Sequence, residues 1–252
     1  MFRVLLAKEF REQWRTWRLL ILVAVLTISG LISPLLAKYT PALLRSIPDM
    51  PPGLAEMIPE PTTADSILQY VKNISQFGLL LAVILIMGTM AQEKERGTAA
   101  MLLTRPVRRS SVVISKWVVW MLSIAAGVVL SGLACWFYTA ILFDMLPLGE
   151  FTLLNLLIWL FLAVYASMAL FASTLARTQS VAAGVAFGGL AVLLVLSSLP
   201  RVNEYMPSQL LAWGSEIISN GHATYWPALA ISAAIILAFL VVACLRFERE
   251  EI

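Results

Sequence analysis

The stretch that decides the fold is 92–116, QEKERGTAAMLLTRPVRRSSVVISK, a charged segment between two long apolar runs. Gly97 predicts a break in the chain after the first charged residues. Thr98 is a good N-cap for a short helix at Ala99–Thr104. Pro106 is expected to end that helix, because a proline ring disfavours helical geometry in the preceding residue. The segment therefore predicts a helix of about two turns, about 10 Å long, across the ends of two membrane spans.

The pattern E-x-E-x-G-T-x-x-x-L-L-x-R-P-V-x-R, followed by a lysine before an apolar run, resembles the permease subunits of ABC-2 type exporters. The resemblance covers the whole chain in length and span layout, but its specific motif is this one segment. It implies that the segment is a coupling helix, which docks into a groove on a separate ATPase subunit. The alternative is an ordinary amphipathic loop with basic residues that follow membrane topology. The residues that the resemblance assigns to ATPase coupling are Glu95, Gly97, Thr98, Leu102, Leu103, Arg105, Pro106 and Arg109.

The composition indicates an integral membrane protein. Of the 252 residues, 60% are hydrophobic and only 13% are charged, and the mean hydropathy is +0.85. The apolar residues lie in runs of about 18 or more, which is the length that a membrane-spanning helix needs. The calculated pI near 9.0 is compatible with nucleic-acid binding, but the basic residues stand beside the apolar runs. Membrane topology explains these residues, so we do not expect a nucleic-acid partner.

The apolar runs predict an all-α protein with six transmembrane helices in one domain, 19–252. The expected spans are 19–37, 74–91, 117–143, 151–175, 180–199 and 227–245. The proline-rich range 38–73 is expected to be a large external loop, and 200–226 a second external region. Within the second region, 208–221 is too short to span and too apolar for a solvated loop. A re-entrant helix, as in ABC-2 exporters, and a loop helix packed over the spans both remain open.

The N-terminal segment 1–18 predicts a cytoplasmic amphipathic helix. Its apolar residues recur at three- and four-residue spacing with charged residues between them, which is typical of a helix in the headgroup layer. The resemblance implies the same element, an elbow helix. A cleaved secretory signal is the weaker interpretation, because the charged part is long and no A-x-A site follows. The apolar positions are Phe2, Leu5, Leu6, Phe10, Trp14 and Trp17.

The distribution of basic residues predicts the orientation in the cell membrane. Six spans place both termini on one side, and fourteen of the eighteen Lys and Arg residues fall on that side. The other four are Lys38, Arg45, Lys72 and Arg201. Because cytoplasmic loops carry the excess of Lys and Arg, both termini are expected to be cytoplasmic.

Residue types needed for catalysis or metal binding are sparse. His222 is the only histidine, which weighs against a histidine-based zinc site or a Ser-His-Asp triad within one chain. No G-x-x-x-x-G-K-[ST] phosphate loop occurs, so if ATP drives the protein, as the resemblance implies, ATP and magnesium are expected on a partner ATPase, with no catalytic, metal or cofactor site in this chain. The expected span interiors lack Asp, Glu, Lys and Arg, which weighs against an ion-coupled carrier. An apolar path suits a hydrophobic or amphiphilic substrate.

Small residues predict close helix packing in two spans. Ser123, Gly127 and Ser131 recur every fourth residue in the third span, and Gly184 and Gly188 form G-x-x-x-G in the fifth. Packing within one subunit is the simpler interpretation. The resemblance also allows a dimer seam at Gly184 and Gly188, with a second permease copy or a similar permease.

These observations lead to one functional hypothesis and one alternative. The chain is expected to be the permease subunit of an ATP-driven exporter, with energy supplied by a separate ATPase subunit. The alternative is a membrane scaffold or assembly factor without transport activity. An intramembrane enzyme is the weakest reading, since the sequence offers no nucleophile–base pair.

Overall fold

The computed structural model describes residues 2–45, 60–98, 108–218 and 224–249, and the regular structure in these ranges is helical throughout. Within them, six helical segments are long and apolar enough to cross a membrane. The all-α class and the number of spans are therefore as predicted.

The spans follow one another in the order of the sequence. They are α2 (Arg18–Arg45), a compound helix of α4 (Thr63–Asn73), η1 (Ile74–Gly78) and α5 (Leu79–Ile86), then α8 (Arg109–Leu142), α9 (Leu148–Leu175), α10 (Gln179–Ser198) and α13 (Trp226–Glu248). The shorter helices are α1 (Phe2–Arg15), α6 (Ala91–Glu95), α11 (Pro200–Asn203) and α12 (Ser208–Ile218).

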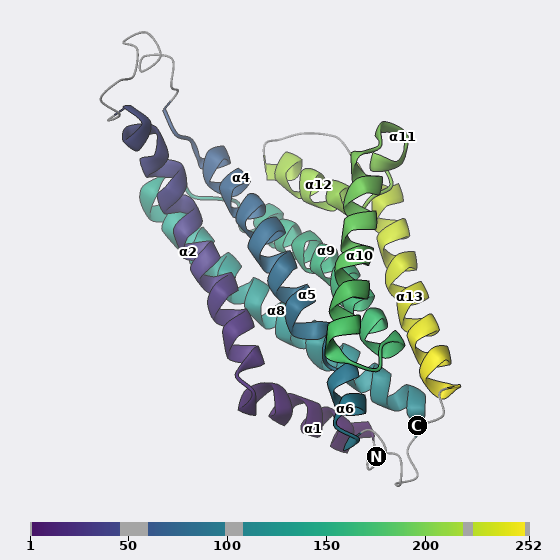
Figure 1. Cartoon of the computed structure of the whole chain (residues 1–252). Coiled ribbons are helices and arrows are strands. Elements are labelled where there is room, and N and C mark those ends of the chain that lie inside the picture. Colours follow the sequence, from purple (N-terminus) through teal and green to yellow (C-terminus); the bar gives the residue numbers. More distant parts are fainter. Residues whose placement is uncertain (1, 46–59, 99–107, 219–223, 250–252) are drawn as a thin grey trace.

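The spans stand side by side as one bundle, and α1 lies across one end of it (Figure 1). The start of α8 and the end of α13 lie at the same end, which we call the terminal end. A backbone turn at Trp17 separates α1 from α2, and its φ of 61° is in the left-handed region. This turn lets α1 run across the bundle while α2 runs along it.

The first span is longer than expected. The sequence predicts 19–37, but α2 continues to Arg45 with Pro34 and Pro41 inside it. A proline removes one backbone hydrogen bond, and spans tolerate this where neighbouring helices and hydroxyl side chains provide other partners. Residues 38–45, expected in the external loop, are therefore helical.

The second span also begins earlier than expected, at Thr63 rather than at residue 74. Asp65 forms a capping box with Thr62, which starts α4. The polar residues that made this stretch look like a loop have partners on other spans. Ser66, Tyr70 and Asn73 bond at 2.8 Å to side chains of α8, α9 and α2, respectively. Both ends of the predicted loop 38–73 are thus helical, and its middle, 46–59, lies outside the described residues.

Helix α9 forms the centre of the bundle. In its most apolar window 72% of the residues are buried, against 17% for α10 and 22% for α13. Helices α2 and α8 pack closely through the predicted small residues: the Ser131 hydroxyl donates to the Leu26 carbonyl at 2.6 Å, and a Cβ on Gly127 would lie 2.6 Å from the Leu26 side chain. The small-residue prediction for the third span is therefore confirmed within the subunit.

The short helix expected within 208–221 is present as α12. Its Leu210, Leu211 and Trp213 are buried, and Gly214 lies so close to α9 that a Cβ would clash with Leu154. The helix packs against α9 and α4. Re-entrant insertion of this helix into the membrane stays a prediction.

Candidate coupling site at the terminal end

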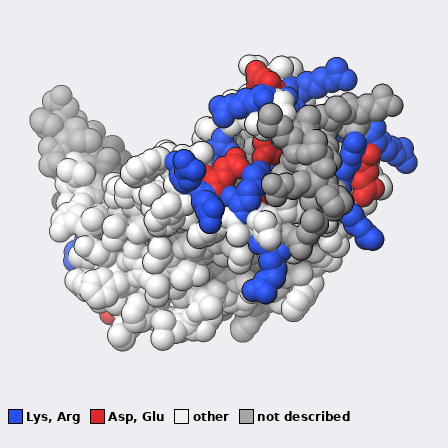
Figure 2. Space-filling view, turned by 90° about the horizontal axis from the view of Figure 1, so that it is seen from below, with Lys and Arg blue, Asp and Glu red and all other residues white. Residues whose placement is uncertain are grey.

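Charged side chains gather at the terminal end, which Figure 2 shows from below. Much of the remaining surface in this view is uncharged. The charged segment of the sequence leaves the second span here, so we build the site from its first residues outward.

The charged segment begins with a short stem, residues 91–98. After α6 the chain turns at Gly97, whose φ of 69° lies in the left-handed region that favours glycine. The Thr98 hydroxyl donates to the backbone carbonyl of Glu93 at 3.1 Å and folds the chain back on α6. The predicted break at Gly97 is thus present, whereas the short helix predicted at Ala99–Thr104 lies outside the described residues.

The stem is bonded to the last turn of α9. The hydroxyl oxygen of Ser173 accepts hydrogen bonds from the backbone N–H groups of Met90 and Ala91, at 2.9 and 3.1 Å. The Lys94 ammonium donates to the backbone carbonyl of Thr174 at 2.6 Å. Because these bonds satisfy carbonyl and N–H groups at two helix ends, they hold the stem in one place relative to α9.

The stem is also bonded to the start of α10 and to α2. A carboxylate oxygen of Glu95 accepts the backbone N–H of Gln179, the first residue of α10, at 3.1 Å. A carboxylate at a helix N-terminus also interacts favourably with the helix dipole. The Gln92 side chain donates to the Gln179 amide oxygen at 2.8 Å and accepts from Arg18 at 2.6 Å. The stem therefore contacts three spans besides its own.

A buried ionic network joins the stem to α1 and α8. The Lys116 side chain, 1% exposed, places its ammonium 2.8 Å from Glu9 Oε2 and 2.9 Å from Glu93 Oε1. The Lys8 ammonium lies 2.7 Å from the same Glu93 oxygen and 2.9 Å from Glu9 Oε1. Two carboxylates and two ammonium groups thus neutralise one another, which a buried charge requires. We call these four residues the ionic network.

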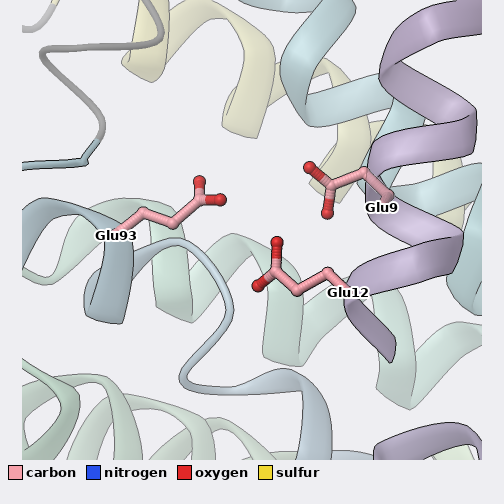
Figure 3. A group of neighbouring side chains, drawn as sticks. All are labelled: Glu9, Glu12 and Glu93. Atoms are coloured by element: carbon pink, nitrogen blue, oxygen red, sulfur yellow. The ribbon is translucent and has the colours of Figure 1, made fainter. Parts of the chain in front are cut away.

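Three carboxylates, two of them members of this network, point toward one another (Figure 3). Glu9, Glu12 and Glu93 offer oxygens within 4.8 Å of one another, a spacing compatible with a cation. Two ammonium groups already offset most of their charge, because Lys8 lies within 3.4 Å of all three carboxylates and Lys116 contacts Glu9 and Glu93. The donor set is therefore that of an ion-pair network, and we do not assign a metal to it.

The carboxylates also change the acidity of Lys8. Burial by itself lowers the pKa of Lys8, but the negative charges of Glu9 and Glu93 and their hydrogen bonds outweigh burial and raise the pKa above its ordinary value. The ammonium form of Lys8 is thus maintained throughout the physiological pH range.

The packing of α1 differs from the predicted amphipathic pattern. The sequence analysis grouped Leu5 with the aromatic side chains on one apolar side. In the structure Leu5 faces the bundle together with Glu9 and Gln13, and the Ser123 hydroxyl of α8 donates to the Gln13 amide oxygen at 2.6 Å. Hydrogen bonds to α8 make this polar side the buried one, so the aromatic residues stay outside.

The remaining predicted site residues fall into three groups. Arg109 opens α8, and its guanidinium donates to the backbone carbonyl of Glu248 at the end of α13, at 3.4 Å. At Gly184 and Gly188, a Cβ would meet no atom of the described chain within 4 Å, so the described part of this subunit offers them no packing partner. The others, Leu102, Leu103, Arg105 and Pro106, lie outside the described residues.

Sequence reasoning missed the ionic network. It placed Lys116 at the membrane boundary as a topological charge, but the residue lies well inside α8, and its side chain is almost fully buried. It placed Glu9 on the solvated side of the first helix. The sequence did contain one signal for this network. Glu9 and Glu93 stand among Lys and Arg residues at the ends of the predicted spans, where acidic side chains have basic partners for ion pairs.

A family model identifies the family, and a second comparison finds a relative along nearly the whole chain. A family model described as ABC-2 family transporter protein matches residues 3–252. The chain is also 27% identical over 256 residues to a Bacillus subtilis (strain 168) protein named "Uncharacterized transmembrane protein YxlG", with 98% of this chain and 97% of the relative covered. The resemblance noted in the sequence is thereby confirmed along almost the whole chain. This protein, whose described residues include six helices long and apolar enough to cross a membrane, belongs to the ABC-2 family of transporter proteins.

Proposed function

We propose that this chain is the permease subunit of an ATP-driven exporter, with the terminal end in the cytoplasm and ATP bound by a separate ATPase subunit. Membership of the ABC-2 family supports a transport role, and the absence of a phosphate loop supports nucleotide binding by another chain. The excess of Lys and Arg at the terminal end supports the orientation.

The observation that carries this proposal is the anchoring of the stem. Residues 91–98 bond to α2, α9 and α10, and Glu93 joins them to α1 and α8 through the ionic network. A segment that merely connects two spans has no need for so many contacts. A segment that receives a force from a partner has to pass it to several helices at once.

The mechanism is a rigid-body transmission. ATP binding brings two ATPase subunits together, and the coupling segment that follows Thr98 moves with them. Since Lys116 and Ser173 hold the stem to α8 and α9, these helices move as the stem moves. The helices rearrange as units, as is common in switching proteins, and open a path toward the opposite side.

The proposed substrate is hydrophobic or amphiphilic. In the described spans the buried polar groups away from the terminal end are uncharged, as with Ser33, Asn73 and Thr139. Ion-coupled carriers usually need ionisable groups at membrane depth. A path lined by apolar and neutral polar side chains instead favours a cargo that is itself apolar in part.

A second permease copy completes the proposed transporter. Helix α10 is the least buried span, and its Val181, Val185 and Phe187 are exposed. With Gly184 and Gly188 unpartnered in the described chain, this face is available to a second copy of the chain or to a similar permease.

The test uses the two leucines of the proposed coupling helix. The affinity-tagged chain is purified in mild detergent from the cells that produce it, and ATP hydrolysis of the sample is measured. Burial of one leucine contributes about 1.5–3 kcal/mol, so Leu102→Asp/Leu103→Asp should remove most of the associated ATPase activity. Arg105→Glu should cost less, because exposed ion pairs contribute about 0–1 kcal/mol.

Leu148→Asp is the matched control, because Leu148 is exposed and starts α9 at the opposite end of the bundle. It should leave the associated ATPase activity unchanged. Unaltered ATPase activity in a correctly inserted Leu102→Asp/Leu103→Asp variant would reject the coupling role of this segment.

A further inference from the structure

Helix α1 has an outer face that the rest of the described chain leaves uncovered. The burial of Leu5, Glu9 and Gln13 toward α8 fixes the rotation of the helix. Residues on its other sides and at the following turn are therefore directed away from the bundle. We define the outer face of α1 as Arg3, Phe10, Arg11, Trp14, Arg15 and Trp17, all of them exposed.

The aromatic side chains of this face are more exposed than is expected of a surface that contacts only water. Phe10 is 50% exposed, Trp14 55% and Trp17 66%. Tryptophan and phenylalanine at the end of a span are typical of the interface between hydrocarbon and water. The left-handed turn at Trp17 makes α1 run across the end of the bundle rather than along it (Figure 1).

The arginines of the outer face have no counter-ion in the described chain. Arg3, Arg11 and Arg15 lie near two acidic residues of the same helix, but both are engaged elsewhere. Glu9 pairs with Lys116 and Lys8, and Glu12 pairs with Lys8. Both acidic residues of α1 are thus paired with lysines, which leaves its guanidinium groups available to an external anion.

We propose that the outer face of α1 binds the headgroups of anionic phospholipids. The aromatic side chains enter the headgroup layer, and the guanidinium groups of Arg11 and Arg15 pair with lipid phosphates, for which their planar donors are well suited. Lipid binding at α1 rests on one part of the proposed function, which is that the terminal end lies in the cytoplasm. Because Lys116 and Glu93 join α1 to the stem, bound headgroups also hold the stem in position.

The test compares lipid classes at α1 in the intact protein. A single fluorophore is attached through Thr16→Cys, with Cys135→Ala and Cys244→Ala removing the native thiols, and the full chain is reconstituted in phosphatidylcholine vesicles. Quenching by brominated phosphatidylglycerol and by brominated phosphatidylcholine gives the relative affinity of the two lipids at this site. One basic residue near an anionic surface corresponds to about a fivefold preference. Arg11→Gln/Arg15→Gln should therefore lower the preference for phosphatidylglycerol about 25-fold.

The matched control removes the same charge elsewhere at this end. Arg177→Gln/Arg246→Gln alters two exposed arginines outside α1 and should leave the preference at position 16 within about twofold of the wild-type value. In the wild-type sequence, raising the salt from about 0.05 M to about 0.5 M should weaken the preference, because salt screens exposed charges.

Three results would overturn the proposal. The first is an equal loss of preference in the Arg177→Gln/Arg246→Gln control, which would indicate a general surface potential. The second is a wild-type preference that is absent or insensitive to salt. The third is an unchanged lipid preference in Arg11→Gln/Arg15→Gln together with loss of the associated ATPase activity, which would assign the arginines to a protein partner. Failure of the ATPase test with the leucine variants would leave this lipid measurement intact.

Discussion

The ammonium group of Lys116 lies 2.8 Å from a carboxylate oxygen of Glu9, although 107 residues separate the two in the chain. Both side chains are almost fully buried, at 1% and 7% exposure. The pair fixes α1 to the start of the third span. Since Lys116 also pairs with Glu93, the same ammonium group connects α1 to the stem of the charged segment.

Removal of Lys116 should be far more damaging than removal of Lys8. Lys116→Met leaves buried carboxylates short of a cation, which typically costs about 3–5 kcal/mol. The Lys8 side chain is 37% exposed, so solvent can compensate much of its loss, and Lys8→Met should cost about 1 kcal/mol or less. The midpoint of thermal unfolding in detergent, followed by tryptophan fluorescence, measures both.

A double variant separates lost pairing from lost packing. Glu9→Leu/Lys116→Met removes the buried pair as a unit and should be more stable than Lys116→Met alone, because no buried carboxylate of Glu9 then remains uncompensated. A single Lys116→Met variant with the wild-type midpoint, or a double variant less stable than the single one, would contradict this account of the network.

Lys8 should retain its proton at unusually high pH. Its pKa is raised above the ordinary value of 10.5, so protonation favours the folded state. This stabilisation is fully present below the pKa of an unfolded lysine and is lost as the pH rises through the higher folded pKa. Competitive labelling of Lys8 with an amine reagent as a function of pH measures the value.

The Glu93→Gln variant tests the cause of the raised pKa of Lys8. The variant removes one of the two carboxylates that raise the pKa, so the midpoint of the labelling curve of Lys8 should shift to lower pH. Identical curves in the wild type and in Glu93→Gln would show that Glu93 does not hold the proton on Lys8.

Alanine at Gly97 should destabilise the stem through the backbone alone. The φ of Gly97 is 69°, and a Cβ there would meet no described atom within 4 Å, so steric contact is not the cause. A non-glycine residue in the left-handed region costs about 1–2 kcal/mol. Asn tolerates this region better, and Gly97→Asn should lose less than Gly97→Ala in the unfolding midpoint.

Gly149 is the matched position for Gly97. A Cβ at Gly149 also meets no described atom within 4 Å, but the residue lies in the first turn of α9 without a positive φ. Gly149→Ala should be neutral or slightly stabilising, since alanine favours helix. Equal effects at the two glycines would mean that the backbone turn at Gly97 is not what matters.

The sequence predicted those parts of the fold that depend on local apolar character. Each of the six spans was found, because a run of apolar residues identifies a membrane helix without knowledge of its neighbours. The stretch Thr63–Asn73 was taken for a loop, since its polar residues have partners only after α2, α8 and α9 have packed around them. A hydropathy pattern contains no information on hydrogen bonds to other spans, so it could not identify this stretch as part of a span.

The same difference between local and long-range interactions explains which features of the candidate site the sequence predicted and which it did not. The break at Gly97 is a local property, because it depends on one residue with conformational freedom, and it was predicted. The burial of Lys116 depends on Glu9, which is distant in the chain, so positive-inside counting treated this lysine as an ordinary boundary charge. Charges that pair across helices need the tertiary structure to be recognised.

Glycines in two spans should respond differently to added bulk. A Cβ on Gly30 would collide with the backbone oxygen of Ser131, so Gly30→Ala should push α2 and α8 apart. Overpacking of this kind costs about 1–3 kcal/mol, and the loss of stability should not depend on protein concentration.

At Gly184 and Gly188 the described subunit leaves open space. Gly184→Leu/Gly188→Leu should therefore preserve the unfolding midpoint of the monomer but weaken association of two copies, measured by cross-linking in membranes. Unchanged cross-linking in this variant would remove α10 from the proposed dimer seam.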